Sequence, residues 1–140
     1  MKKQSYRQYS MEAFRFLARE GSTDRYIKKL LEDYDKQQRN TGVCNPTEAA
    51  LVHKDKILRD HAAELADLDA AEKAMLLLFD CERRAVEMAY CKDAWRELEW
   101  GDIESRIVAA SLDTHSDRAS IYRWLDKACK SFAVERGLRT

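Results

Sequence analysis

The residues with the clearest chemical potential lie near the C-terminus, where cations repeat at helical spacing. Arg123, Lys127 and Lys130 fall on one side of an expected helix. The opposite side carries an apolar stripe at the same period, formed by Ile121, Trp124, Leu125, Ala128 and Phe132. A helix that is buried on one side and cationic on the other suits insertion into the major groove of duplex DNA. Residues 116–132 are therefore the main candidate for function.

Arg123 is the first candidate for a contact with a base or a phosphate, because Arg can donate two parallel hydrogen bonds to a guanine edge. Arg118 would have to reach a phosphate from the first helical turn. Tyr122 lies on the flank, where it could touch phosphate or pack against the preceding helix. Lys127 and Lys130 would supply charge to the DNA backbone. An ordinary solvated surface is the alternative for each of these cations.

Small residues at the start of the same helix would let its backbone approach DNA closely. Ser116, Ala119 and Ser120 have short side chains, and the two hydroxyls or the helix N-terminus could bond a phosphate. The simpler alternative is that Ser116 caps the helix and that Ser120 has no special role. These three residues complete the expected contact set.

Catalysis finds little support in the sequence. His53 and His61 are eight positions apart and no HExxH motif occurs, so a helical zinc site of that kind is not expected. The acidic residues around His61 are Asp60, Glu64 and Asp67, and a solvated acidic face explains them better than a cation site. No glycine-rich phosphate loop is present. We expect neither an enzyme nor a cofactor or metal.

The charge of the chain is balanced overall and uneven locally. The 140 residues hold 25 Lys and Arg against 25 Asp and Glu. Residues 1–46 and 118–140 each have four more cations than anions, whereas the stretch between them is acidic. A local basic patch can contact phosphates, while the neutral total predicts weak non-specific affinity for nucleic acid.

Cysteine usage and hydropathy indicate a cytoplasmic protein with no membrane partner. Cys44, Cys81, Cys91 and Cys129 form no CxxC pair, and Cys81 and Cys91 are expected to be small buried hydrophobes rather than reactive thiols. The first residues lack the apolar core of a signal peptide, and the longest apolar run, residues 74–79, is too short to span a bilayer.

The N-terminal half is expected to form a helical hairpin. Ser10 would cap a helix over residues 11–19, and Ser22 or Thr23 would cap a second over residues 24–38. The second helix has a buried stripe at helical spacing, formed by Tyr26, Ile27, Leu30, Leu31 and Tyr34. A loop rich in turn-forming residues, 39–46, then separates this hairpin from the rest of the chain.

After this loop, Thr47 is expected to cap a long helix over residues 48–68. Its leucines recur every seven residues, at Leu51, Leu58 and Leu65. Three heptads could form half of a dimer seam, but packing against Tyr26–Tyr34 within one chain is favoured. Asp69 has capping-box spacing to Glu72, which predicts a break and a new helix from residue 70. Residues 70–79 are apolar on nearly every side and should lie at the centre of the packing.

The C-terminal half is expected to contain three more helices. They span residues 81–91, 102–112 and 117–135, with Asp102 and Ser116 as the N-caps of the last two and Gly137 as a C-terminal stop. Trp95 and Trp100 would fill the connection before the second of them. With four Gly, one Pro and no alternating strand pattern, the sequence predicts an all-α fold. We expect a helical arm over residues 1–70 and a helix-turn-helix domain over residues 71–140.

The C-terminal third resembles the DNA-binding region of sigma-70-type factors. The similar residues are Glu82-Arg83, Trp95, Asp102-Ile103-Glu104 and Ser120-Ile121-Tyr122-Arg123. In such proteins a Glu-Arg helix precedes a short helix, and a motif of the Ser-x-x-Thr-Ile-Tyr-Arg kind opens the recognition helix. The chain length and the helical N-terminal arm are similar, more narrowly, to phage late-operon transcription regulators of the ArpU and RinA type. The turn between the last two helices lacks the usual Gly.

This resemblance implies sequence-specific binding to double-stranded DNA and regulation of transcription, with RNA polymerase as a further partner. Residues 1–70 would then serve oligomerisation, for example as a homodimer, or contact with a partner. The alternative hypothesis is a helical protein-interaction or adaptor module whose basic terminal helix meets an acidic protein and does not bind DNA.

Overall fold

The computed structural model describes residues 5–41 and 54–138, which contain helices and no strand. The elements, in chain order, are α1 (Tyr6–Glu20), α2 (Thr23–Thr41), α4 (Ala62–Leu76), α5 (Asp80–Val86), the π-helical turn η1 (Glu87–Cys91), α6 (Asp102–Thr114) and α7 (Arg118–Arg136). Residues 54–60 are also helical and lead into α4. The expected all-α class is therefore confirmed.

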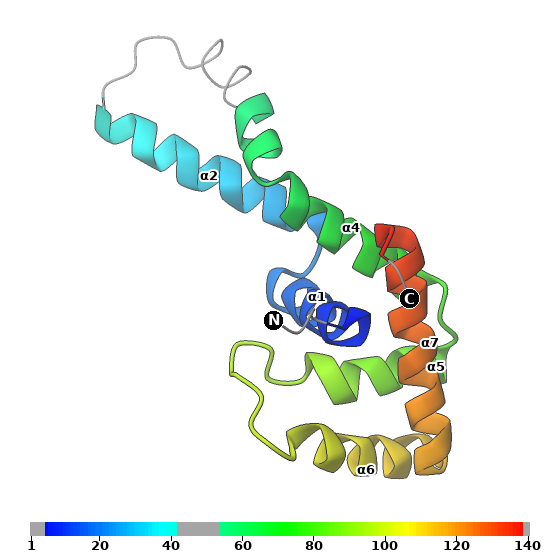
Figure 1. Cartoon of the computed structure of the whole chain (residues 1–140). Helices are drawn as coiled ribbons and strands as arrows, with labels where there is room; N and C mark the ends of the chain where they lie inside the picture. The colour runs from blue at the N-terminus through cyan, green and yellow to red at the C-terminus, as the bar shows by residue number, and fades with distance from the viewer. Residues whose placement is uncertain (1–4, 42–53, 139–140) are drawn as a thin grey trace.

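The helices form a bundle from which two of them project as an arm. α1 lies at the centre of the bundle and packs against α4, η1 and α7. α7 runs along one side of the bundle past α4, α5 and α6 (Figure 1). The arm consists of α2 and of residues 54–60, and α2 packs against α1 and α4 near its base. The core thus joins helices from both ends of the chain.

Aromatic side chains form the contact between α1 and α7. The ring centroid of Phe132 lies 5.8 Å from that of Tyr9 and 5.9 Å from that of Phe14. Phe14 and Phe132 are fully buried, and Phe14 also stacks on Tyr90 of η1. Because aromatic residues bury large apolar areas, these pairs fix α1 against α7. The boundary expected at residue 70 falls inside α4, and α1 belongs to the same core as α7.

A buried guanidinium joins α1 to the segment that follows η1. Arg15 is only 6% exposed and donates hydrogen bonds to the carbonyls of Tyr90 (2.8 Å), Asp93 (3.3 Å) and Arg96. The carbonyls at a helix end lack partners within the helix, so they need donors from elsewhere. Arg106 of α6 bonds the carbonyl of Ala89 in the same way. Arginine donors therefore hold the end of η1 and the loop that leads to α6.

The cap of α1 differs from the expectation. The helix starts five residues earlier than predicted, with Ser5 as the N-cap, whose side chain accepts a hydrogen bond from the N–H of Gln8. Ser10 is fully buried inside the helix, and its hydroxyl lies within hydrogen-bonding distance of the carbonyls of Tyr6 (2.6 Å) and Cys129 (3.2 Å). Ser10 therefore contributes to the packing of α1 on α7 and not to the helix start.

The arm also departs from the expected boundaries. α2 continues to Thr41, so the first residues of the expected loop 39–46 are helical. The break expected at Asp69 is wrong, because α4 is continuous from Ala62 to Leu76 and the interruption falls at His61, whose backbone leaves the helical region. Leu58 and Leu65 are half-buried. Cys44, Thr47, Leu51 and His53 lie outside the described residues.

The apolar run at the end of α4 is less buried than the sequence suggested. Ala70, Ala71, Ala74 and Leu78 are in the core, but Leu76, Leu77 and Phe79 are 77%, 62% and 72% exposed. Cys81 is exposed as well, contrary to expectation. The chain turns between α4 and α5. Consecutive apolar side chains therefore point in different directions, and only Leu78 of residues 76–79 is buried.

Two further details concern the connection to α6. Trp95 and Trp100 are largely exposed and do not fill the connection. Gly101, with φ 86°, occupies the N-cap position expected for Asp102, whose carboxylate instead accepts a hydrogen bond from the N–H of Glu99 (2.7 Å). At the other end of the domain, Gly137 ends α7 with φ 78°, as predicted.

Replacing Arg15 tests its role in holding η1 and the following loop. Arg15→Ala should lower the free energy of unfolding by about 2–4 kcal/mol, because the carbonyls of Tyr90, Asp93 and Arg96 lose a charged donor. Urea unfolding followed by circular dichroism measures this loss. Arg15→Lys should recover only part of it, since one ammonium cannot reproduce the guanidinium fork. Equal stability of Arg15→Ala and the parent protein would contradict this role.

Candidate nucleic-acid interface

A compact turn joins α6 to α7 and fixes where α7 begins. α6 ends at His115, which adopts a left-handed conformation with φ 54° and donates its N–H to the carbonyl of Ser111. His takes the place that Gly often holds at a helix end, and it tolerates this conformation better than most residues. The turn comprises His115, Ser116 and Asp117, and α7 starts at Arg118. The turn between α6 and α7 is therefore tight although it contains no Gly.

Asp117, and not Ser116, caps α7. The Asp117 carboxylate accepts a hydrogen bond from the N–H of Ser120 at 2.8 Å. Hydrogen bonds from the Ser120 side chain and N–H lower the pKa of Asp117, so this cap is ionised at neutral pH. Ser116 stabilises the turn instead: its N–H donates to the carbonyl of Ser111 and its carbonyl accepts from the Ser111 hydroxyl. The expectation that Ser116 caps this helix is therefore wrong.

The buried side of α7 is the one the sequence predicted. Ile121, Ala128 and Phe132 are fully buried, Leu125 is 4% exposed, and Trp124 is partly buried. These side chains face α1, α4, α5 and α6, which pack around α7. The helix is thus held rigidly along its length. Its first two turns keep their outer side in solvent.

The exposed start of α7 carries most of the expected contact set. Arg118, Ala119, Tyr122 and Arg123 are exposed, and Ser120 is half-buried. The Arg123 guanidinium donates a hydrogen bond to the Ser120 hydroxyl at 3.0 Å, and its charge helps to lower the pKa of Asp117. Neither Arg118 nor Arg123 forms a close ion pair with any carboxylate of the described chain. Both guanidinium groups therefore remain accessible to a ligand.

Tyr122 is compatible with both roles considered for it. Half of its surface is exposed, and the rest lines a small cavity with Ile103 and Ile107 of α6. The ring therefore contacts the preceding helix while leaving part of its surface in solvent. A phosphate contact would use that exposed part.

Lys127 of α7 is paired with Glu82 of α5. Its ammonium lies 2.8 and 2.9 Å from the two oxygens of Glu82 and 4.8 Å from the centroid of the Phe79 ring. Glu82 is 5% exposed and also accepts the N–H of Phe79. Burial raises the pKa of Glu82, but hydrogen bonds from Lys127 and Phe79 outweigh this, and the net shift is downward. Lys127 thus neutralises a buried carboxylate and anchors α7 to α5.

Lys130 is also paired, at the surface. Its ammonium lies 2.9 Å from Asp126, one turn earlier on the same helix, and Asp126 also pairs with Arg7 of α1 at 2.7 Å. Both pairs are solvent-exposed enough that competition from a phosphate is inexpensive. The cationic side of α7 therefore divides into two unpaired arginines at its start and two paired lysines further along.

Sequence reasoning missed an apolar groove beside these lysines. The groove has a volume of about 390 Å³. Leu77 and Val134 line it together with three cations and two carboxylates, namely Arg123, Lys127, Lys130, Asp126 and Glu135. Val134 is 74% exposed. No local signal could have revealed the groove, because Leu77 and Val134 are far apart in the sequence and meet only when α4 packs on α7.

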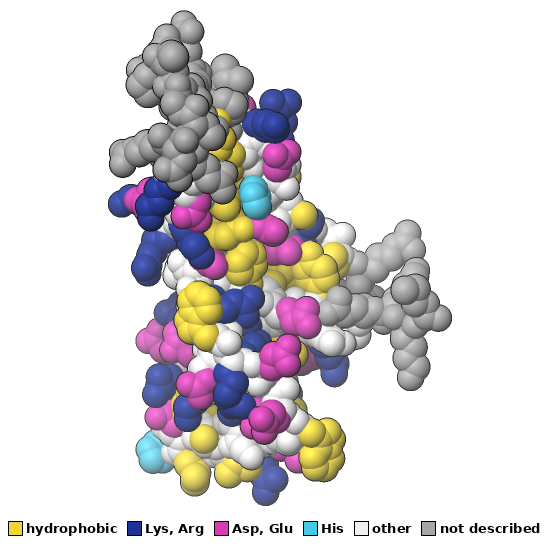
Figure 2. Space-filling model, turned by 90° about the vertical axis from the view of Figure 1, so that its left-hand side faces the viewer, with side chains coloured by type: hydrophobic (Ala, Val, Ile, Leu, Met, Phe, Trp, Pro, Cys, Tyr) yellow, Lys and Arg dark blue, Asp and Glu magenta, His cyan; other side chains and the backbone are white. Residues whose placement is uncertain are grey.

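On the face that Figure 2 shows, acidic and basic side chains are interspersed, and hydrophobic side chains form a stripe along the arm. In residues 5–41 and 54–138, no group of three or more His, Cys, Asp and Glu side chains is arranged to hold a metal ion. None of the helices in these ranges has the length and apolar character that crossing a bilayer requires.

No family model, curated protein or solved structure matches this chain. Its function must therefore be inferred from its own side chains. The start of α7 combines a rigid support, a small-residue surface and unpaired cations.

The Lys127–Glu82 pair makes a testable contribution to stability. Lys127→Ala should lower the free energy of unfolding at pH 7 by about 1–2 kcal/mol, because the buried Glu82 carboxylate loses its main partner. The loss is modest because solvent already screens the half-exposed Lys127 in the parent protein. Urea unfolding measures this change. The lowered pKa of Glu82 means that its ionisation stabilises the fold above the ordinary value of 4.5 and that this stability is lost as the pH falls through the folded-state pKa.

The difference between Lys127→Ala and the parent protein should therefore shrink as the pH falls below 4.5 and through the folded-state pKa of Glu82. Lys130→Ala is the matched control, since its surface pair should contribute under ~1 kcal/mol. A difference in stability that is independent of pH would show that the charge of Glu82 is not involved.

Proposed function

We propose that this protein binds duplex DNA through the outer side of α7 and regulates transcription. The observation that carries the proposal is the pair of unpaired arginines, Arg118 and Arg123, on the exposed first turns of a helix that is buried along its other side. Cations without a close ion-pair partner at an exposed, rigidly held helix start suit the approach to a polyanion.

In this proposal, different residues at the start of α7 contact the bases and the phosphates. Arg123 bonds a base edge, where its fork matches the two acceptors of guanine. Arg118 and the half-exposed Tyr122 contact phosphates on either side of the groove. Ala119 and Ser120 leave space for the α7 backbone to come close to the DNA. Ser116 acts indirectly, because it holds the turn that positions these residues.

The lysines extend the same surface. Lys130 exchanges its exposed ion pair with Asp126 for a contact with a phosphate. Lys127 remains paired with Glu82, so it adds to the positive electrostatic potential of the surface without contacting DNA directly. Balanced total charge limits attraction to arbitrary DNA, so discrimination between sequences depends on the contacts of Arg123.

α6, the turn at His115–Asp117 and α7 would then act as a helix-turn-helix, with α7 as the recognition helix. This assignment agrees with the resemblance to sigma-70-type factors and, through it, with regulators of phage late operons. RNA polymerase is the protein partner implied by the same resemblance, and pairing of half-sites would require a homodimer.

A second candidate function is a helical adaptor that binds an acidic protein. The observation that favours it is the exposure of Leu77, Phe79 and Val134 next to Lys127 and Lys130. Apolar and cationic side chains together suit an acidic amphipathic segment better than they suit phosphates.

DNA binding by Arg123 can be tested with fragments from the genomic neighbourhood of the gene in a mobility-shift titration. Arg123→Ala should weaken binding to the preferred fragment by about 1–3 kcal/mol and reduce discrimination against other fragments, because a base contact is lost. Arg118→Ala should weaken all fragments alike and reduce the dependence of log K on log salt by about one, because a phosphate contact is lost.

The matched control is Arg59→Ala, which removes an exposed arginine from the arm and should leave binding unchanged. If Arg123→Ala and Arg59→Ala bind equally well with the same salt dependence, α7 is not the DNA-binding surface. If the parent protein binds no fragment selectively, the adaptor function is favoured.

A further inference from the structure

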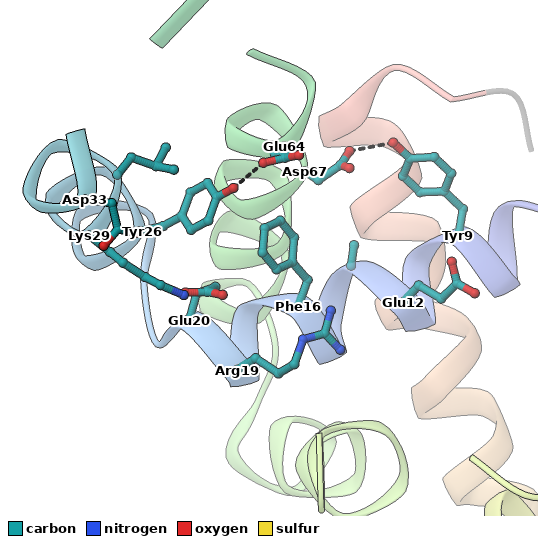
Figure 3. A pocket seen from close by; sticks show the side chains of 12 residues that line it. Tyr9, Glu12, Phe16, Arg19, Glu20, Tyr26, Lys29, Asp33, Glu64 and Asp67 are labelled. Atoms are coloured by element: carbon teal, nitrogen blue, oxygen red, sulfur yellow. Dashed lines mark hydrogen bonds and ion pairs between the residues drawn. The ribbon is translucent and has the colours of Figure 1, made fainter. Parts of the chain in front are cut away.

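A second groove lies between α1, α2 and α4 (Figure 3). Its volume is about 560 Å³. The α1 residues that line it recur at helical spacing and are Tyr9, Glu12, Ala13, Phe16, Arg19 and Glu20. Because these positions span about three turns of helix, the groove is about 16 Å long. Its length therefore matches a helical segment of about ten residues better than it matches a small molecule.

The floor of this groove is apolar and aromatic. Phe16 and Tyr26 meet edge to face with their ring centroids 5.2 Å apart, and Ala13 and Leu30 lie beside them. Figure 3 shows Phe16 and Tyr26 between α2 and α4, with Tyr9 further along α1. A side chain such as Leu or the methylene stem of Lys would find an apolar surface here.

The walls of the groove are acidic. Five carboxylates line it, Glu12, Glu20, Asp33, Glu64 and Asp67, against two cations, Arg19 and Lys29. The cations are already engaged: Lys29 pairs with Glu20 at 3.5 Å, and Arg19 lies over the Phe16 ring and bonds the carbonyl of Ala94. Asp33 is exposed and forms no ion pair with any described residue. The groove therefore attracts cations and repels phosphates.

Tyrosine hydroxyls donate hydrogen bonds to two of these carboxylates. The hydroxyl of Tyr26 donates to Glu64 and that of Tyr9 donates to Asp67 at 2.6 Å. Hydrogen bonds from Tyr26 and His61 lower the pKa of Glu64, and burial raises that of Tyr26. Asp67 also pairs with Arg136 of α7 at 2.7 Å. The acidic character of the walls is thus built into the packing of α1, α2 and α4.

We propose that this groove binds a basic amphipathic helical segment of a partner protein. Apolar residues of the segment would lie on Phe16 and Tyr26, and its Lys or Arg side chains would face Glu12 and Asp33 at the rim. The groove and the DNA-binding side of α7 have opposite charge preferences. One molecule could therefore hold DNA at α7 and a basic protein segment at α1.

The probe is a fluorescein-labelled helical peptide of about 14 residues, roughly four turns, with Leu and Ala on one side and Lys on the other. A second peptide has Glu in place of every Lys. Fluorescence anisotropy with the full-length protein should show that the Lys peptide binds at least about tenfold more tightly than the Glu peptide. Its binding should weaken as salt is raised.

The test variant is the double substitution Glu12→Lys and Asp33→Lys, which reverses the charge of the rim and keeps the pairs of Glu20, Glu64 and Asp67. It should bind the Lys peptide about tenfold more weakly than the parent protein. The matched control, Glu99→Lys with Glu104→Lys, makes the same change of total charge at exposed positions outside the groove and should bind like the parent protein. Circular dichroism verifies that both variants are folded.

Three outcomes would overturn the proposal. They are equal binding of the two peptides, equal loss of binding in both double variants, and a concentration-dependent dimer in sedimentation that only Glu12→Lys/Asp33→Lys abolishes, since a second copy would then occupy the groove. DNA binding is measured separately on the same variants. Retained selective DNA binding with no peptide binding would reject the groove alone, and the converse would reject the function proposed for α7 alone.

Discussion

The fold depends on hydrogen bonds to the backbone carbonyls at the end of η1, where the helix stops and the next residues cannot supply all the donors. A π-helical turn leaves carbonyls that cannot all be bonded by following residues, and here arginine side chains from other helices supply the donors. Arg15 of α1 bonds the carbonyl of Tyr90 in η1 and two carbonyls of the loop that follows. This places α1 in the middle of the bundle and fixes the start of the loop that leads to α6. The orientation of α6, and through its turn that of α7, follows from this contact.

Several ion pairs in this molecule join one helix to another. Glu82 and Lys127 connect α5 to α7, Asp126 and Arg7 connect α7 to α1, and Asp67 and Arg136 connect α4 to α7. Each pair uses a charge that would otherwise remain on the surface. The distribution of charge is uneven: among the described residues, Arg118 and Arg123 at the start of α7 form no ion pair, and the groove between α1, α2 and α4 is lined by more carboxylates than cations. The two proposed binding surfaces are these two regions.

The sequence predicted the features that depend on periodicity and failed where contacts are long-range. The apolar stripe through Ile121, Leu125, Ala128 and Phe132 was identified because helical spacing alone defines it. Caps were harder, since Ser5 and Ser10, or Ser116 and Asp117, are equally plausible until the packing of the helix is known. The commitment of Lys127 to Glu82 and the acidic groove could not be predicted, because they join residues that are far apart in the chain. For the same reason, the exposure of Leu77 and Phe79 was unexpected: consecutive apolar residues suggest a core, but a turn disperses them.

The described thiols differ sharply in reactivity. Burial raises the pKa of Cys91 to about 12 and also raises that of Cys129, so both remain protonated and are poor nucleophiles at neutral pH. Cys81 is exposed on α5, next to Glu82 and therefore close to the point where α5 meets α7. Among these three, it is the one on which alkylation or attachment of a dye can proceed without opening the core. The molecule thus carries a natural attachment point for a spectroscopic reporter near the contact between α5 and α7.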